Sequence, residues 1–382
     1  MSALEAATPL PPFQKAISRS CVTSLRENSL LIGCTLLYVC LVNLTAAIHG
    51  APYTTFHLLG NVYRTFAAIC IAALAIAFIL WILKVTVLQG NSVRSAGFWR
   101  RVPTEFMSPE RFLLALPVLL LWPLFVNTFS LAKSLITLIQ PFYLDQALVQ
   151  LDRALHGGWD PWVLLQPLLG HPLVTYSFDK FYALWFFVLY LGLLLQAFAV
   201  RDRRVRMQFL LSFTLAWPLL GNVGATLLSS AGPCYYALIG LGDLFAPLTA
   251  YLHDAAAPAN LSLFGFQLPL ELIALRAQDF LWSKYQEGQF VLGSGISAAP
   301  SMHVATTWLI ARMCQARGSR MAPWAWAFVA IILVGSVHLG WHYAVDGYLA
   351  IAGAWMIWRV VGWLLNRPAV QRFLWGEAQI AR

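Results

Sequence analysis

Long apolar runs separated by short polar segments dominate the chain. Eight of these runs are candidate membrane spans: residues 29–49, 64–88, 111–135, 179–199, 207–229, 301–316, 322–338 and 342–365. A helix needs about 20 apolar residues to cross roughly 30 Å of hydrocarbon, so the ends of the short sixth and seventh runs are the least defined. Because backbone groups in lipid must form hydrogen bonds within their own segment, we expect every span to be helical.

The basic residues give the orientation of these spans. Lys and Arg cluster in five segments: the first 28 residues, the segments after the second, fourth and sixth spans, and the C-terminal tail. Such clusters mark cytoplasmic segments, and all five fall on one side of an eight-span chain. We therefore expect cytoplasmic tails at 1–28 and 367–382. The opposite loops carry acids, among them Asp145, Asp152, Asp160, Asp243 and Asp254.

Two of the opposite loops are long, at about 136–178 and 230–300. Loops of this length in a compact protein are usually functional or disordered, and these are rich in Trp, Tyr, Phe and Leu. We therefore expect short amphipathic helices lying on the outer membrane surface. The fold predicted is an all-α, polytopic transmembrane helical bundle, with N-terminal transmembrane helices at 29–135 and a catalytic transmembrane domain at 136–366.

Composition supports a membrane protein and argues against two other classes. Hydrophobic residues make up 59% of the chain and charged residues 11%, against roughly 45–50% and about 25% in ordinary soluble domains. The net charge of +9 resides in segments between apolar runs, with no basic patch interleaved with exposed aromatics, so no nucleic-acid partner is predicted. The six cysteines have no regular spacing, which indicates neither a disulfide framework nor a zinc site.

The segment HLGWHYAVDGY at 338–348 carries the strongest chemical signal. His338, His342 and Asp346 are spaced by four, which predicts one stripe on a helix at the outer end of the last span. A carboxylate one turn after a histidine can accept a hydrogen bond from one ring nitrogen and leave the other free as nucleophile or base. A purely structural pair and a zinc site are the alternatives, although no further acid or cysteine stands nearby.

A second signal, GISAAPSMH at 295–303, falls on the same predicted side. Pro300 suits the first turn of a helix, and small residues precede it. The small residues allow an anion to approach the backbone N–H groups at the helix N-terminus closely, and phosphate suits such a site. Ser301 would lie at this site, either as a phosphate donor or as a plain helix cap, and these roles are compatible. His303 would lie within one turn of the anion.

Together, PSMH followed by H-x-x-x-D resembles the second and third signature motifs of the type 2 phosphatidic acid phosphatase superfamily. Residues 151–162 and the sequence GISAAPSMHVA are most similar to its inositolphosphotransferase branch, the inositol phosphorylceramide synthase type. The resemblance implies a six-helix core in which His342 attacks phosphorus and Asp346 orients it. It also implies that His303 acts as acid and then base, and that Ser301 holds phosphate oxygens.

The chain departs from this family pattern in its positive charges. The family has a Lys and an Arg in a first motif, for which we find no clear counterpart, and Ser336 stands where the third motif usually has an Arg. Lys284, Arg276 and His338 are candidates to hold phosphate instead. Fewer fixed charges favour a phosphodiester, which carries one negative charge, over a monoester, which carries nearly two. This favours transferase chemistry.

The function predicted is therefore a lipid phosphotransferase that moves a phosphoryl or phosphoinositol-like group from a phospholipid to a lipid or polyol alcohol, without metal or cofactor. The first alternative is a lipid phosphate phosphatase acting on phosphatidate or a polyprenyl phosphate with water. The second is a transporter or scaffold, although we see neither the internal repeat nor the midplane charges of many transporters. Composition, with 16 Trp and Arg favoured over Lys, suggests a bacterial inner membrane and a periplasmic site.

Overall fold

The computed structural model describes residues 12–376 except 91, 257–261, 264 and 268–270, and these described residues are mostly helical. Strands β1 (Ser262–Leu263) and β2 (Phe266–Gln267) form one short antiparallel pair. The all-α class predicted from the apolar runs is therefore confirmed.

A helix occupies each of the eight predicted spans. These helices are α2 (Ser29–Ile48), α3 (Leu59–Leu83) with η1 (Lys84–Leu88), α5 (Pro109–Ile139), α8 (Pro172–Ala197), α9 (Arg203–Pro218) with η3 (Leu219–Gly224) and α10 (Ala225–Leu227), α13 (Met302–Ala316), α14 (Ala322–His338) and α15 (Ala344–Leu365). Six of them are long and apolar enough to cross a membrane. Helices α13 and α14 have only 15 and 17 residues, so within the described ranges six helices, rather than eight, meet that length.

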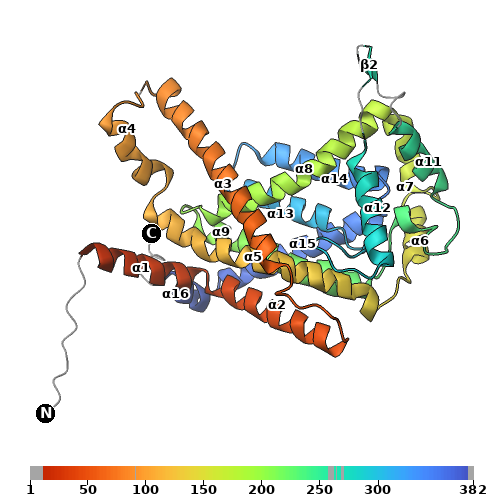
Figure 1. The fold of residues 1–382 in the computed structure, drawn as a ribbon, viewed down its shortest axis with the longest axis horizontal. Helices are drawn as coiled ribbons and strands as arrows, with labels where there is room; N and C mark the ends of the chain where they lie inside the picture. Colours follow the sequence, from red (N-terminus) through yellow and green to blue (C-terminus); the bar gives the residue numbers. More distant parts are fainter. Residues whose placement is uncertain (1–11, 91, 257–261, 264, 268–270, 377–382) are drawn as a thin grey trace.

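Shorter helices gather at the two ends of the bundle. Those of the long outer loops are α6 (Asp145–Leu155), α7 (Pro161–Leu169), η4 (Pro233–Tyr235), α11 (Ala246–Ala255) and α12 (Ile273–Gln286). Those of the other segments are α1 (Pro12–Glu27), α4 (Ala96–Arg101), η2 (Val102–Phe106) and α16 (Pro368–Trp375). Helices α6, α7, α11 and α12 lie at one end, whereas α1 and α16 pack together at the other (Figure 1). The predicted helices in the outer loops are thus present.

The bundle is built around α13, which packs against α14, α15, α9 and α8. Its side chains Val304 and Leu309 are fully buried, as are Ile332 of α14 and Ala350 of α15. Helix α3 instead lies on the outside of α5 (Figure 1) and leaves apolar side chains such as Ile71 more than half exposed. An exposed apolar helix surface of this kind is what a lipid environment requires.

At the end of the bundle near α1 and α16, Arg206 of α9 joins the N-terminal helices to the rest. Its guanidinium is 1% exposed and donates hydrogen bonds to Asn28 before α2, to the Leu114 carbonyl in α5 and to the Gln196 carbonyl in α8. Burying an ionised group is costly unless hydrogen bonds replace its water. The acceptors around Arg206 therefore hold four helices in one arrangement.

At the opposite end, two carboxylates of α6 fix the start of α15. Asp145 and Asp152 are two helical turns apart, so they share one face. The Asp152 oxygens accept hydrogen bonds from the N–H groups of Ala344 and Val345, each at 2.8 Å. Burial raises the pKa of Asp152, although these two N–H groups act to lower it. Helix N-termini favour negative charge, so Asp152 acts as a cap supplied from another helix.

Asp145 ties a second segment to the same place. It accepts hydrogen bonds from the N–H groups of Ala231 and Gly232 at 2.9 and 2.8 Å, and from the Tyr343 hydroxyl at 2.8 Å. A carboxylate has two oxygens that match two successive N–H groups, and both acids of α6 use this geometry. Helix α6 therefore sets the positions of the 231–232 loop and of residues 343–345 together.

The Asp152→Ala variant tests this anchoring. It leaves two N–H groups at the start of α15 without acceptors, which we expect to lower the free energy of unfolding by about 1–3 kcal/mol. The measurement is the midpoint of thermal unfolding of the purified protein in detergent. Asp243→Ala is the matched control because Asp243 is an exposed acid of the same face. Equal midpoints for the two variants would contradict the anchoring role.

Candidate active site

His338, His342 and Asp346 do not form the single predicted stripe, because His338 ends α14, His342 lies in the connection that follows and Asp346 is in the first turn of α15. His338 is the last residue of α14, and α15 begins at Ala344. Between them the N–H groups of Trp341 and His342 both bond to the Ser336 carbonyl, and Gly340 has φ +73°. Only glycine adopts such a backbone readily, and a glycine just past a helix end commonly stops the helix. The stripe prediction is therefore wrong for His338.

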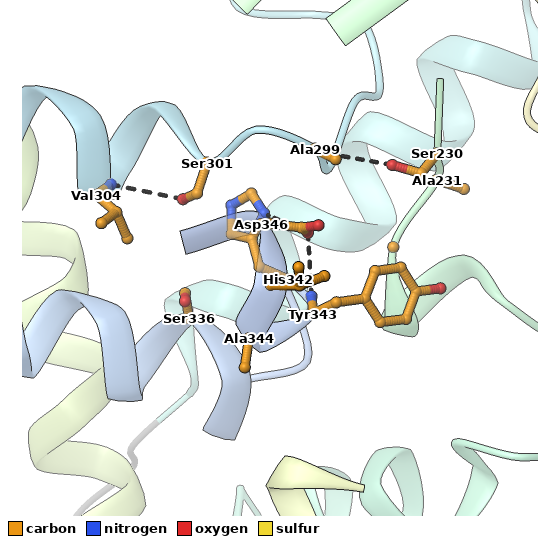
Figure 2. Close-up of polar contacts among 12 residues, drawn as sticks. Ser230, Ala231, Ala299, Ser301, Val304, Ser336, His342, Tyr343, Ala344 and Asp346 are labelled. Carbon is orange, nitrogen blue, oxygen red and sulfur yellow. Dashed lines mark hydrogen bonds and ion pairs between the residues drawn. The ribbon is translucent and has the colours of Figure 1, made fainter. Parts of the chain in front are cut away.

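His342 and Asp346 nevertheless form a buried pair. Nδ1 of His342 lies 3.3 Å from Oδ2 of Asp346, which also accepts a hydrogen bond from the Tyr343 N–H at 3.1 Å. The two residues are 7% and 0% exposed (Figure 2). With its Nδ1–H donated to this carboxylate, His342 keeps an Nε2 lone pair for reaction.

The start of α13 is joined directly to this pair. Ser301 is the N-cap of α13, where its hydroxyl accepts the Val304 N–H (Figure 2). Its own N–H donates to the Asp346 carbonyl at 3.1 Å. His303 follows in the first turn, and its ring centre lies 6.1 Å from that of His342. The structure thus brings together His303, His342, Asp346 and Ser301 from two distant sequence motifs.

Aromatic residues of α8 surround His303. The ring centre of Tyr182 lies 4.6 Å away in a stacked arrangement, and that of Trp185 lies 4.0 Å away. Trp185 also donates its indole N–H to the Thr306 hydroxyl at 3.0 Å. Our sequence reading assigned these residues no part in the site because aromatic side chains in an apolar run look like ordinary packing.

A lysine that our sequence reading overlooked also lies near His303. Lys133 of α5 and His342 are both within electrostatic range of the His303 ring. Within the described part of the chain, no carboxylate lies within ion-pair distance of Lys133. The only hint in the sequence is that this single charge interrupts an apolar run, and ionisable residues at membrane depth usually serve function.

The small residues before Ser301 are explained by close contact with α5. A Cβ atom at Gly295, which has φ +93°, would lie 2.9 Å from the backbone oxygen of Lys133. The Gly293 N–H donates to Ser130 of α5 at 2.9 Å, and the hydroxyls of Ser294 and Ser134 lie 3.2 Å apart. The 293–295 backbone therefore lies directly against the helix that carries Lys133.

Three predicted phosphate-binding residues have other contacts. His338 is fully buried, with Nε2 2.9 Å from the Thr175 hydroxyl and its ring against Phe178. Arg276 pairs with Glu271, and Lys284 pairs with Glu287. None of these contacts supports phosphate binding by His338, Arg276 or Lys284, and those roles stay predictions.

A cavity adjoins the nucleophile candidate. It is small, with room for about one water molecule, and is lined by residues that include His342, Tyr343, Asp152, Asp160 and Trp162. A site of this size and polarity suits a single hydroxyl group, which can donate a hydrogen bond to a carboxylate. Among the described residues, no group of three or more His, Cys, Asp or Glu is placed to hold a metal ion.

The arrangement combines a buried imidazole oriented by a carboxylate, a second imidazole within reach of the same substrate, and one nearby cation. A scan against protein families matches residues 146–363, more than half of the chain, to the PAP2 superfamily. A search of curated proteins and a search of solved structures gave no match. The matched range includes His303, His342 and Asp346, and it includes Asp152 of α6 but begins just after Asp145. Because the match covers most of the chain and all of the His–Asp site, this protein belongs to the PAP2 superfamily.

Proposed function

We propose that this membrane protein is a lipid phosphotransferase that moves a phospho-alcohol group, such as phosphoinositol, from a phospholipid to an alcohol acceptor. The observation that carries the proposal is the buried His342–Asp346 pair with the His303 ring centre 6.1 Å from that of His342. This spacing leaves room for one phosphoryl group between a nucleophile and an acid. The inositolphosphotransferase assignment rests further on the similarity of residues 151–162 and 295–305 to that branch.

The reaction has two steps through a covalent histidine. Nε2 of His342 attacks phosphorus and forms a P–N bond while the P–O bond to the diacylglycerol alcohol breaks, and His303 protonates that oxygen. His303, now neutral, takes the proton of the acceptor hydroxyl, whose oxygen attacks phosphorus as the P–N bond breaks. Asp346 stabilises the positive charge that develops on the His342 ring. Acid–base help of this kind contributes about 10²–10⁴ in rate.

Lys133 and the first turn of α13 would hold the phosphate. Lys133 supplies a positive charge near His303, and the N-terminus of α13 at Ser301 supplies backbone N–H groups suited to an anion. The small cavity beside His342 would take one hydroxyl of the donor's or acceptor's alcohol group. We place this end of the bundle on the periplasmic side of a bacterial inner membrane because the basic segments of the sequence lie at the other end.

The first prediction concerns the covalent intermediate. With a phospholipid ³²P-labelled in its head group, wild-type protein quenched in alkali should carry an acid-labile label, and His342→Ala should carry none. We expect His342→Ala to lower turnover by about 10³-fold or more, because the nucleophile is lost. His253→Ala is the matched control, since His253 is an exposed histidine of α11 on the same end of the bundle. Label or near wild-type turnover in His342→Ala would refute the nucleophile assignment.

The second prediction separates transfer from hydrolysis. Purified protein is incubated with phosphatidylinositol labelled in its head group, with and without an acceptor, which is ceramide or a diacylglycerol whose acyl chains differ from those of the donor. A transferase should produce a new labelled phospholipid only when an acceptor is added. If the label instead appears in water-soluble phosphate at the same rate with or without acceptor, the protein is a phosphatase, and the transferase proposal fails.

A further inference from the structure

Two hydrogen-bond donors beside the histidine pair have no acceptor. The Tyr182 hydroxyl and the Trp341 indole N–H are both buried and make no hydrogen bond with the residues that the structure describes. Tyr182 as a whole is only 6% exposed. Leaving a buried donor unpaired is costly, so such groups in native proteins call for an explanation.

Both donors belong to the same cluster of rings as the histidines. Tyr182 stacks on His303 with 4.6 Å between ring centres and 24° between planes, and it lies nearly parallel to Trp341 at 6.5 Å and 10°. Trp341 directly precedes His342 in the chain, and Tyr182 is within electrostatic range of Asp346. A group bound between His303 and His342 would therefore be the nearest ligand for both donors.

The basic residues at this end of the bundle differ in whether they have an acidic partner. Four basic residues in or next to the two long outer loops each have a carboxylate partner at 3.0 Å or less: Arg153 with Asp160, Lys180 with Asp179, Arg276 with Glu271 and Lys284 with Glu287. Lys133 differs from them because, among the described residues, it has no such partner. The histidine pair therefore has one uncompensated cation beside it.

We propose that the Tyr182 O–H and the Trp341 N–H donate hydrogen bonds to the non-bridging oxygens of a bound phosphodiester, and that Lys133 balances its single negative charge. This inference rests on the proposed function and names its substrate class. Neutral donors satisfy oxygen lone pairs without adding positive charge. A phosphomonoester would bring a second negative charge into a buried site where, among the described residues, only the proton on His303 is left to balance it, which is unfavourable.

The test compares two lipids that differ by one methyl group and one charge. Dioleoyl phosphatidylmethanol is a phosphodiester, and dioleoyl phosphatidate is the corresponding monoester; attack on either at phosphorus releases the same diacylglycerol. With purified full-length protein in detergent micelles that contain a fixed excess of ceramide as acceptor, we expect kcat/KM for the diester to exceed that for the monoester by about 10-fold or more, because the monoester brings a further charge into the site. This comparison needs only the wild-type protein.

Two conservative variants then test the donors themselves. Tyr182→Phe and Trp341→Phe each keep a ring and remove one donor, and we expect each to lower kcat/KM for the diester by about 10–100-fold. Tyr190→Phe is the matched control because it removes a hydroxyl from the same helix, where Tyr190 packs against Phe66. The midpoints of thermal unfolding of all three variants identify any loss that comes from misfolding.

The outcomes separate this inference from the proposed function. If the protein forms the labelled His342 intermediate but both variants keep the diester activity of wild type within about twofold, this inference is wrong and the proposed function stands. If it forms that intermediate but prefers phosphatidate, the phosphodiester class and the transfer of a phospho-alcohol group are both wrong, and only covalent catalysis by His342 remains. If neither lipid yields diacylglycerol and no labelled intermediate forms, both proposals fall together. A diester preference that Tyr182→Phe and Trp341→Phe weaken, while Tyr190→Phe does not, supports the inference.

Discussion

The pairing of carboxylates with successive backbone N–H groups holds the outer end of this bundle together. Asp152 receives the first two N–H groups of α15, and Asp145 receives those of Ala231 and Gly232. Asp179 of α8 repeats the arrangement with Ile273 and Ala274 at the start of α12. The pairs at α15 and α12 satisfy groups that a helix start leaves without partners and place a negative charge at the positive end of the helix, whereas the Asp145 pair fixes a loop.

This constraint explains how a site made from short motifs can be well defined. His342 lies in the connection between α14 and α15, and loops between helices are generally the more mobile parts of a fold. Here the connection is held by α6 from one side and by the Ser301 N–H from the other. The buried groups that result include carboxylates and the neutral donors of Tyr182 and Trp341, with Lys133 as the nearby cation. Such surroundings suit chemistry on a substrate of low negative charge.

The sequence predicts the scaffold well because hydrophobic runs and helices share one physical cause. Every apolar run forms a helix, and the aromatic-rich outer loops form short ones, since backbone groups surrounded by apolar side chains need local partners. The sequence also predicts that the Ser301 and His342 segments lie at the same end of the bundle, because consecutive spans run in alternating directions. The two short apolar runs at 301–316 and 322–338 likewise form the two short helices α13 and α14.

The errors concern contacts that no local pattern records. The spacing of His338, His342 and Asp346 fits a helix, but α14 ends at His338 and Gly340 follows with a positive φ. This glycine is a helix-ending signal in the sequence, and we gave the spacing more weight. Lys133 and Tyr182 come near the histidines through the packing of α5 against α8 and of α8 against α13. Their sequence surroundings are those of any lipid-facing helix, and Trp341 looks like an ordinary interfacial aromatic beside His342, so only the three-dimensional arrangement distinguishes them.

The contact between Gly295 and the Lys133 backbone has a consequence for what counts as the working unit of this protein. The family match begins at residue 146. Lys133 and the part of α5 that contacts residues 293–295 lie before it. A minimal version or a chimera cut at that boundary would keep both histidines and lose the surface that seats them. The extent of the catalytic machinery is therefore defined by side-chain and backbone contacts that cross the boundary of family similarity.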